Sequence, residues 1–273
     1  MVSMNAPLVG LRFSLAGPGK VGTSLSRWAV AAGAELVATA GRGSLETLET
    51  GGQDLLLLAL PDAALPTAAV ELARRPQAAV ALHTSGSLDA SVLAPLREVG
   101  SAVGSLHPLK AFPQPLPDPA EARGVFFAVD GDPAARELAW RLATAWGGVP
   151  GEVPAAARSL YHFAATLAAG GVVTLLAAAG EIAGGLGLPE ALPEAIIRGY
   201  LELARGAVAA AGRTLDAGRP LAAAITGPVA RGDVATVERQ LAALEDHVPD
   251  ALPLARALAQ ETLRQRRRLG TRP

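Results

Sequence analysis

The chain of 273 residues is 50% hydrophobic and 18% charged, and its formal net charge is −1 at pH 7. One hydrophobic core seldom serves a chain of this length, so we expect two domains. The balanced charge gives no reason to expect a nucleic acid or an anionic membrane as partner, and the absence of cysteine excludes disulfides, thiolate metal sites and cysteine nucleophiles.

The first half of the chain alternates short apolar runs with segments of helical period. Helical patterns such as Val21–Ala32 and Ala134–Trp146 lie between several of the runs. This alternation indicates a parallel sheet covered by helices on both faces. The sequence thus predicts an α/β domain with a doubly wound sheet over residues 1–154, whose strands are Leu11–Ala16, Glu35–Ala40, Asp54–Leu60, Ala78–Leu82, Ala102–Leu106 and Val125–Val129.

A glycine-rich segment connects the first predicted strand to the first predicted helix. It reads Gly17-Pro18-Gly19-Lys20-Val21-Gly22, which is the pattern G-x-G-x-x-G in the context that dinucleotide binding needs. Gly17 permits a tight turn, Gly19 lets the backbone approach a pyrophosphate, and Gly22 lets helix and strand pack closely. The start of the helix offers free N–H groups to the phosphates. The alternative is an ordinary glycine-rich turn, but strand, turn and helix together favour a Rossmann domain.

The segment after the second predicted strand bears on the choice of dinucleotide. An NAD-binding domain would place Asp or Glu there for the ribose 2′-hydroxyl, whereas this chain has Gly41-Arg42-Gly43-Ser44. The guanidinium of Arg42 suits a 2′-phosphate and Ser44 adds a hydroxyl, although a solvated loop arginine is the alternative. We therefore expect NADP(H), held by Arg42, Ser44 and the glycine motif, and also by Leu60, Pro61 and Ser85.

Three loops should converge beside the nicotinamide end of the cofactor, since each follows a predicted strand. They are Leu60-Pro61-Asp62, His83-Thr84-Ser85-Gly86-Ser87 and His107-Pro108-Leu109-Lys110. Both His83 and His107 follow apolar runs, so we expect them at the crevice rather than in a core. A histidine there can move the proton that accompanies hydride transfer, and Lys110 could hold a substrate carboxylate or donate a proton. Alternatively, His107 only shapes a turn and Lys110 is solvated.

After about Pro154 the pattern changes to long Ala- and Leu-rich helical stretches, which predict an all-helical substrate and dimerisation domain over residues 155–273. Phe163–Gly180 has no charged residue and is long enough to raise the question of a membrane span. Its small residues and the lack of flanking aromatic belts favour a helix buried in a homodimer. No signal peptide is readable at Met1–Leu11, so we expect a cytoplasmic protein. The predicted helices are Ala156–Leu186, Pro189–Ala211, Val234–His247 and Asp250–Arg268, interrupted by a loop at Ala224–Asp233.

Two polar groups in the second half are further candidates. Tyr161 and His162 open the long predicted helix, where they either reach a cleft or anchor the helix. Thr226 and Arg231 lie in the Gly- and Pro-shaped loop, which either orients a polar substrate or only separates two helices, with Asp233 as the N-cap of the second. The histidines are scattered without metal-ligand spacing, so we expect no metal site.

The order of these motifs resembles proteins that join a Rossmann domain to a DUF2520 domain, a family often labelled as NADP oxidoreductases dependent on coenzyme F420. The chain also resembles the 6-phosphogluconate dehydrogenase-like superfamily, which includes pyrroline-5-carboxylate reductase, ketopantoate reductase and prephenate dehydrogenase. The resemblance implies a helical domain that commonly builds a dimer, with the active site in the cleft between the domains. The family pattern has Asn a few residues after the Tyr-His motif, where this chain has Gly170-Gly171. The segments that carry the resemblance are 17–22, 54–61, 83–86, 105–109, 161–165 and 226–233.

The motifs and the resemblance together predict an NADP(H)-dependent oxidoreductase for a small polar substrate such as a keto acid, an imine or a hydroxy acid. An F420-linked NADP oxidoreductase is one alternative and needs a wide apolar cleft for a flat tricyclic ring. A non-catalytic NADP sensor is the other, and the missing Asn favours it. The expected acid or base is His107, and the expected substrate contacts are Lys110, Tyr161, His162, Thr226 and Arg231.

Overall fold

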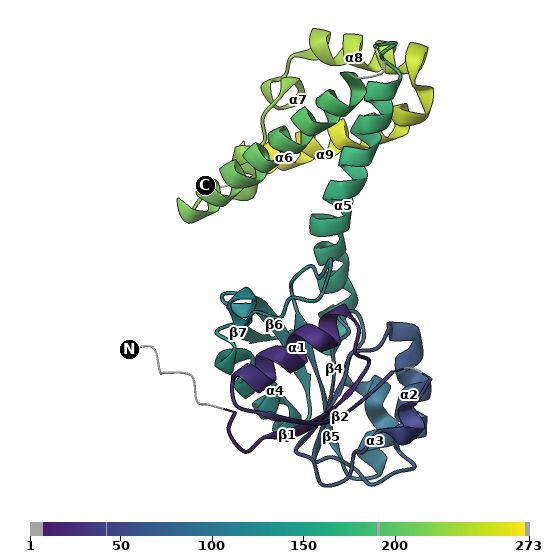
Figure 1. Ribbon diagram of the computed structural model, residues 1–273. Helices are drawn as coiled ribbons and strands as arrows, with labels where there is room; N and C mark the ends of the chain where they lie inside the picture. Colours follow the sequence, from purple (N-terminus) through teal and green to yellow (C-terminus); the bar gives the residue numbers. More distant parts are fainter. Residues whose placement is uncertain (1–7, 42, 190–191, 271–273) are drawn as a thin grey trace. The chain divides into compact units, whose positions relative to one another are not determined.

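The computed structural model describes residues 8–41, 43–189 and 192–270 of the chain. They form two compact units, Met1–Ala169 and Gly170–Pro273, and the division falls inside helix α5 (Arg158–Gly184) (Figure 1). Arg42 lies outside the described residues, so its predicted contact with a 2′-phosphate stays a prediction.

The first unit is built on one sheet of seven strands in the order β2-β1-β3-β4-β5-β6-β7. Strands β1 to β5 are parallel, β6 runs antiparallel to β5, and β7 is parallel to β6. The predicted doubly wound α/β fold is therefore confirmed. The strands are β1 (Arg12–Ala16), β2 (Glu35–Ala40), β3 (Leu55–Leu58), β4 (Val80–His83), β5 (Ala102–Pro108), β6 (Phe126–Gly131) and β7 (Val149–Glu152).

Two features of this sheet differ from the sequence-based expectation. Strand β6 is antiparallel because the segment between β5 and β6 contains only the short 3-10 helix η4 (Pro119–Ala122) and no crossover helix, which a parallel connection would need. Strand β7 was not predicted, since Pro150 and Gly151 break its apolar pattern. Proline is tolerated there because β7 lies at the edge of the sheet.

Helices cover both faces of the sheet, and the leucines of β3 alternate between the two cores. Leu55 and Leu57 pack in the core beneath α1 (Lys20–Ala31) and α4 (Pro133–Ala145). Leu56 and Leu58 pack in the core beneath α2 (Leu65–Leu72) and α3 (Ala94–Glu98), on the opposite face (Figure 1). Burial on both faces explains why the strand is an unbroken apolar run. Truncating any of these side chains to alanine should cost about 2–5 kcal/mol of stability.

The segment between β5 and η4 is tied to α1, although the sequence predicts only a surface loop at Phe112–Pro119. The backbone N–H of Leu116 donates to Ser24 Oγ at 2.8 Å, and Trp28 Nε1 donates to the carbonyl oxygen of Leu116 at 2.8 Å. Phe112 packs against the Trp28 ring, with ring centroids 5.9 Å apart. These contacts hold Phe112 close to the end of the glycine motif.

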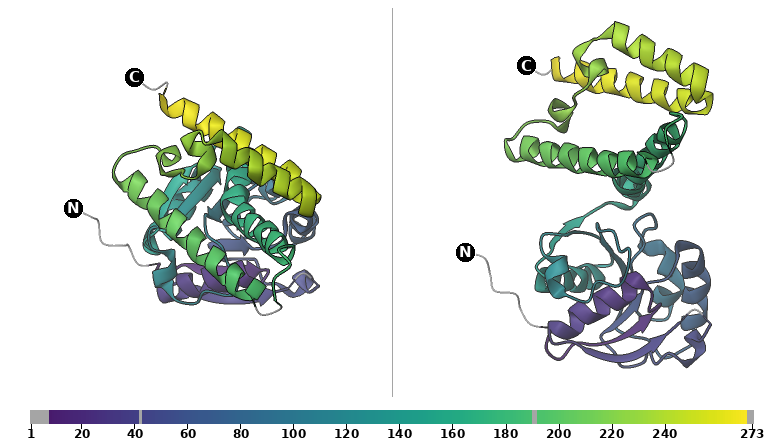
Figure 2. Two further views of the ribbon diagram at one scale, coloured as in Figure 1. Left: turned by 90° about the horizontal axis from the view of Figure 1, so that it is seen from above. Right: turned by 45° about the horizontal axis from the view of Figure 1, so that its top comes forward.

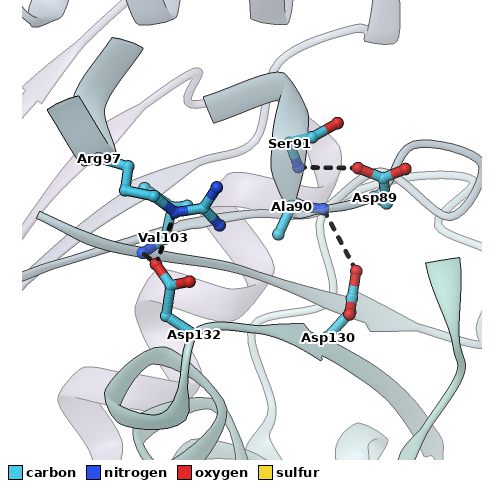
Figure 3. A network of polar contacts seen from close by, with 7 residues as sticks. All are labelled: Asp89, Ala90, Ser91, Arg97, Val103, Asp130 and Asp132. Carbon is cyan, nitrogen blue, oxygen red and sulfur yellow. Dashed lines mark hydrogen bonds and ion pairs between the residues drawn. The ribbon is translucent and has the colours of Figure 1, made fainter. Parts of the chain in front are cut away.

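Asp130 and Asp132 fix the 3-10 helix η3 (Ala90–Leu93) and α3 to the sheet, and Asp89 caps η3 (Figure 3). The carboxylate of Asp89 accepts the N–H of Ser91 at 2.7 Å and so caps η3, and that of Asp130 on β6 accepts the N–H of Ala90 at 3.3 Å. The carboxylate of Asp132 accepts the N–H of Val103 and the Nε–H of Arg97, both at 2.9 Å. The carboxylates of Asp89 and Asp130 are thus engaged by backbone amides.

The described residues of the second unit form helices and loops but no strand, as predicted, and α8 and α9 lie side by side in it (Figure 2). The carboxylate of Asp233 accepts the N–H of Thr236 at 3.1 Å, which confirms the predicted N-cap of α8. The loop expected at Ala224–Asp233 is wrong in one respect, because it contains the short helix α7 (Pro228–Arg231). Proline opens α7, and Gly232 ends it with a φ of +74°. The other helices are α6 (Leu192–Asp216), η6 (Leu221–Ala224), α8 (Val234–His247), η7 (Pro249–Ala251) and α9 (Leu252–Gly270).

Candidate active site

A pocket of about 640 Å³ opens at the carboxyl ends of β1, β3, β4 and β5, wholly within the first unit. After β1 the chain turns into α1 on one face of the sheet, and after β3 it turns into α2 on the other. Neighbouring strands whose connections diverge in this way leave a crevice between them, and ligands bind there in open α/β sheets. The pocket is lined by Gly17, Pro18, Gly19, Lys20, Val21, Gly41, Ala59, Leu60, Pro61, Asp62, Thr84, Ser85, Gly86, His107, Phe112 and His162.

The three glycines of the G-x-G-x-x-G motif do different things in the fold. A Cβ on Gly17, whose φ is +94°, would collide with the carbonyl oxygen of Ala59, and one on Gly22 would collide with that of Gly17. A Cβ on Gly19 would meet no atom within 4 Å. Gly17 and Gly22 are therefore required by the fold, whereas Gly19 leaves open space at the start of α1. That helix begins without a capping side chain, so its first N–H groups are available to a phosphate.

The other predicted cofactor residues lie mainly on the pocket wall. Leu60, Pro61 and Ser85 line it. Ser44 does not; it precedes the 3-10 helix η1 (Leu45–Thr47), and its Oγ donates to the carbonyl oxygen of Gly41 at 3.4 Å. Because Gly41 does line the pocket, the loop that carries Ser44 reaches its rim.

His107 and Tyr161, which are far apart in the sequence, meet at this pocket. Nδ1 of His107 lies 3.0 Å from the Tyr161 hydroxyl, and the two rings are perpendicular at 89°. Burial, followed by the neighbouring His162 and Arg158, lowers the pKa of His107 to about 4. Burial raises the pKa of Tyr161 to about 12. Both groups are thus uncharged at neutral pH, and a hydroxyl that donates to Nδ1 leaves the ring proton on Nε2.

Gly86 lies where two imidazole nitrogens converge. A Cβ at this position would lie 2.5 Å from Nδ1 of His162 and 2.6 Å from Nε2 of His107. Nδ1 of His162 is buried and has no hydrogen-bond partner among the described residues. The absence of a side chain at Gly86 therefore leaves two polar ring atoms facing the same small space at the pocket wall.

His83 does not reach the crevice, which corrects the expectation from the sequence. Its side chain is 0% exposed and both of its ring nitrogens contact backbone. Nδ1 accepts the N–H of Ser85 at 3.2 Å, so Nε2 carries the proton and donates to the carbonyl oxygen of Asp89 at 3.1 Å. Burial lowers the pKa of His83 to about 4. This histidine shapes the loop that presents Ser85 and Gly86.

Neither Lys110 nor Tyr161 is among the residues that line the pocket. Nζ of Lys110 lies 2.9 Å from a carboxylate oxygen of Glu121. Thr226 precedes α7 and Arg231 ends it, both in the second unit, and their role in binding substrate stays a prediction.

Two residues near the site were missed by sequence reasoning. Phe112 lines the pocket but was assigned to a surface loop. Arg158 is 1% exposed and donates from Nη2 to Ser105 Oγ. A charged residue one turn before Tyr161, at the start of an otherwise apolar helix, was the available signal for Arg158.

Comparisons with known proteins agree with this architecture. A family model for a Rossmann-like domain matches residues 10–108, and the model described as a domain of unknown function, DUF2520, matches residues 125–262. No curated protein sequence matches the chain significantly.

Three solved structures illustrate the likeness of fold. Protein TM1727 from Thermotoga maritima is 22% identical with a TM-score of 0.70, and the match covers 95% of this chain and 100% of that one. BF3122 from Bacteroides fragilis, provisionally titled an NADP oxidoreductase, is 17% identical with a TM-score of 0.73, over 93% and 98% of the two chains. A reductive aminase from Aspergillus terreus, in complex with NADPH and ethyl-5-oxohexanoate, is 16% identical with a TM-score of 0.54, over 93% and 94%. By its sequence, this chain belongs to the family of proteins in which a Rossmann-like domain precedes a DUF2520 domain.

Proposed function

We propose that this protein is an NADP(H)-dependent oxidoreductase that acts on a small polar substrate such as a keto acid, an imine or a hydroxy acid. The observation that carries the proposal is a single pocket that joins the G-x-G-x-x-G turn to the His107–Tyr161 pair. A reductive aminase of the same fold binds NADPH. The cofactor, when bound, supplies or accepts the hydride, and the protein supplies binding, orientation and proton handling.

The residues of the pocket fit a dinucleotide. Open space at Gly19 and the uncapped start of α1 suit a pyrophosphate. Gly41 lines the pocket, and Arg42 and Ser44 follow it closely in the sequence. We propose that these two side chains hold a 2′-phosphate. His107, from β5, lines the same pocket and serves as the hydrogen-bond donor to the reacting oxygen or nitrogen of the substrate. Because its pKa is low, we assign this role to the neutral ring, through Nε2–H, with Tyr161 donating to Nδ1.

Thermal unfolding with NADPH, NADP⁺, NADH and no ligand tests the cofactor assignment, on wild type and on Arg42→Ala. A ligand present at a hundred times its dissociation constant stabilises the protein by about 2.7 kcal/mol. We expect stabilisation by the phosphorylated cofactors alone, and its loss in Arg42→Ala. No shift with any dinucleotide would remove the main support for the enzyme.

A non-catalytic NADP sensor is the second candidate function. Gly170-Gly171 in place of the family's Asn favours it. A screen of keto acids, imines and hydroxy acids separates the two, since a sensor binds NADPH tightly but oxidises none of it. The F420-linked enzyme is distinguished by including coenzyme F420 in the screen and following its absorbance.

We further propose that the protein is a cytoplasmic homodimer joined through its helical unit. Among the described residues of that unit the only buried apolar side chain is Ala183, while Leu203, Val208 and Leu215 of α6 are 70%, 63% and 61% exposed. Apolar surface of this extent needs a partner. One helix, Ala155–Gly184, is by length and composition apolar enough to cross a membrane. The exposed ion pair between Arg198 and Glu194 on α6 favours a second copy over lipid.

A further inference from the structure

Arg158 is a buried cation with an incomplete set of partners. It is the first residue of α5, and its side chain is 1% exposed. Nη2 donates to Ser105 Oγ on β5, whereas Nε and Nη1 are buried and have no hydrogen-bond partner within the described chain. A buried charge that is only partly paired is costly, so its presence calls for a compensating role.

No carboxylate forms a contact ion pair with this guanidinium among the described residues. Burial lowers the pKa of Arg158, and the nearby Asp130 and Asp89 oppose this shift. Both carboxylates, however, are already engaged by the N–H groups of Ala90 and Ser91 (Figure 3). Arg158 does not line the pocket, and its two unpaired nitrogens are inaccessible, so a ligand in the pocket cannot touch it. The charge therefore acts on other protein groups.

The residue spacing on β5 and on α5 shows which protein groups lie near Arg158. Ser105 and His107 are two residues apart on β5, so they project from the same face of the sheet. Arg158 and Tyr161 are three residues apart on α5, so they lie on one side of the helix. The contact between Arg158 and Ser105 thus runs beside the hydrogen bond between Tyr161 and His107. Two adjacent bonds between α5 and β5 determine how the two elements meet.

We propose that Arg158 is a positioning residue: its guanidinium, anchored on Ser105, sets the first turn of α5 against β5 so that Tyr161 stays hydrogen-bonded to His107, and its charge opposes a second positive charge on that histidine. The purpose of this arrangement rests on the proposed function, in which neutral His107 donates to the substrate. The arrangement itself does not, and it can be measured without cofactor or substrate.

The electrostatic surroundings of His107 agree with this role. Burial lowers its pKa first, then His162 and Arg158 of α5, with a further contribution from His83 of β4. Asp62, on the pocket wall after β3, acts in the opposite direction. Arg158 therefore offsets a carboxylate that would otherwise favour the imidazolium form.

Histidine NMR on the ligand-free, ¹⁵N-labelled full chain tests the proposal between about pH 7.5 and 5. The His107 signal is identified by its absence in His107→Gln, and the ¹⁵N shifts report both protonation and the tautomer of the neutral ring. In wild type we expect one tautomer and no midpoint within this range. Arg158→Met should raise the midpoint from about 4 by about 1 pH unit or more, so that the ring is at least about half protonated at pH 5, and should mix the tautomers. Arg158→Lys should return the ring to the neutral form at pH 5.

Two further variants make the test decisive. Arg136→Met removes an exposed arginine paired with Glu152 and should leave the His107 signal as in wild type. Ser105→Ala keeps the charge but removes its anchor, and should mix the tautomers of His107 even if Arg158→Met fails to fold. A His107 ring that stays neutral at pH 5 in folded Arg158→Met, or a single tautomer in Ser105→Ala, would overturn the proposal. Failure of NADPH to bind would contradict the proposed function and leave this titration unaffected.

Discussion

The hydroxyl of Tyr161 lies 3.0 Å from Nδ1 of His107, which connects the first turns of α5 to the end of β5 at the wall of the candidate active site. If His107 is the proton donor and Tyr161 only orients it, substitutions of the two residues should lower turnover by different amounts. His107→Ala removes the donor itself and should lower turnover by about 10²–10⁴-fold. NADPH affinity should be retained, because the glycine motif is untouched. Unchanged turnover would exclude His107 as the donor.

Tyr161→Phe provides the milder variant of the same test. It removes one hydrogen bond between neutral groups and should cost about 1 kcal/mol of stability. Turnover should fall less than in His107→Ala, since the imidazole stays in place but loses the group that orients it. Steady-state NADPH oxidation of both variants with the substrate found by screening measures the difference. Equal losses in the two variants would show that Tyr161 does more than orient His107.

The two buried histidines predict how stability depends on pH. The folded pKa values of His83 and His107 are about 4, below the value of about 6.5 expected in the unfolded chain. The unfolded state therefore binds more protons between these values, and stability falls as the pH falls through this window. At about pH 5, each histidine should lower the free energy of unfolding by about 2 kcal/mol relative to its value at neutral pH.

Urea unfolding followed by tryptophan fluorescence measures this loss in the first unit, because all three tryptophans of the chain, Trp28, Trp140 and Trp146, lie in it. His107→Asn should remove about half of the pH dependence that the two histidines share. An unfolding free energy that is constant from neutral pH to about pH 5 would contradict the burial of both rings.

Alanine variants should distinguish the glycine that the fold requires from the glycine that cofactor binding requires. Gly22→Ala introduces a Cβ that collides with the Gly17 carbonyl oxygen, so the first unit should be strongly destabilised. Gly19→Ala meets no atom within 4 Å, so its melting temperature without ligand should match wild type. The added methyl group nevertheless occupies the space that a pyrophosphate needs, and stabilisation by NADPH should be lost. A Gly19→Ala protein that NADPH still stabilises would place the phosphates elsewhere.

Gly86→Ala tests the space between the two ring nitrogens. The new Cβ would lie 2.5 Å from Nδ1 of His162 and 2.6 Å from Nε2 of His107, so both rings must move. We expect turnover to fall at least as far as in Tyr161→Phe, with NADPH affinity retained. Gly206→Ala is the matched control, because a Cβ on this α6 glycine meets no atom within 4 Å and it lies in the second unit. Equal turnover in the two glycine variants would show that the reaction does not depend on the space at Gly86.

The proposed homodimer predicts a change in molecular mass. Leu203→Glu and Val208→Glu place charges at two exposed apolar positions of α6 and should convert a dimer into monomers, measured by light scattering or sedimentation. Glu202→Gln, at an exposed residue paired with Arg205 on the same helix, should leave the mass unchanged. A wild-type monomer would contradict the dimer directly, and detergent-dependent solubility would point to a membrane instead.

Elements and caps that depend on short sequence patterns could be predicted from the sequence alone. Short apolar runs located strands β1 to β6, and helical periodicity located the helices α1, α4, α5, α6, α8 and α9, to within a few residues. The glycine motif predicted a tight turn between a strand and a helix, and Asp233 was correctly predicted as the N-cap of α8. Each of these signals rests on a few neighbouring residues, whose spacing and backbone preferences are independent of the rest of the fold.

What only the tertiary structure decided depends on distant parts of the chain. His83 and His107 both end apolar runs, yet one is enclosed by its own loop and the other lies on the pocket wall. Arg158 is buried only because α5 meets β5 at Ser105. The direction of β6 likewise follows from a connection that lacks a helix. The sequence by itself determined the elements and the cofactor turn, whereas burial, strand direction and side-chain pairing follow from long-range packing, which no local period encodes.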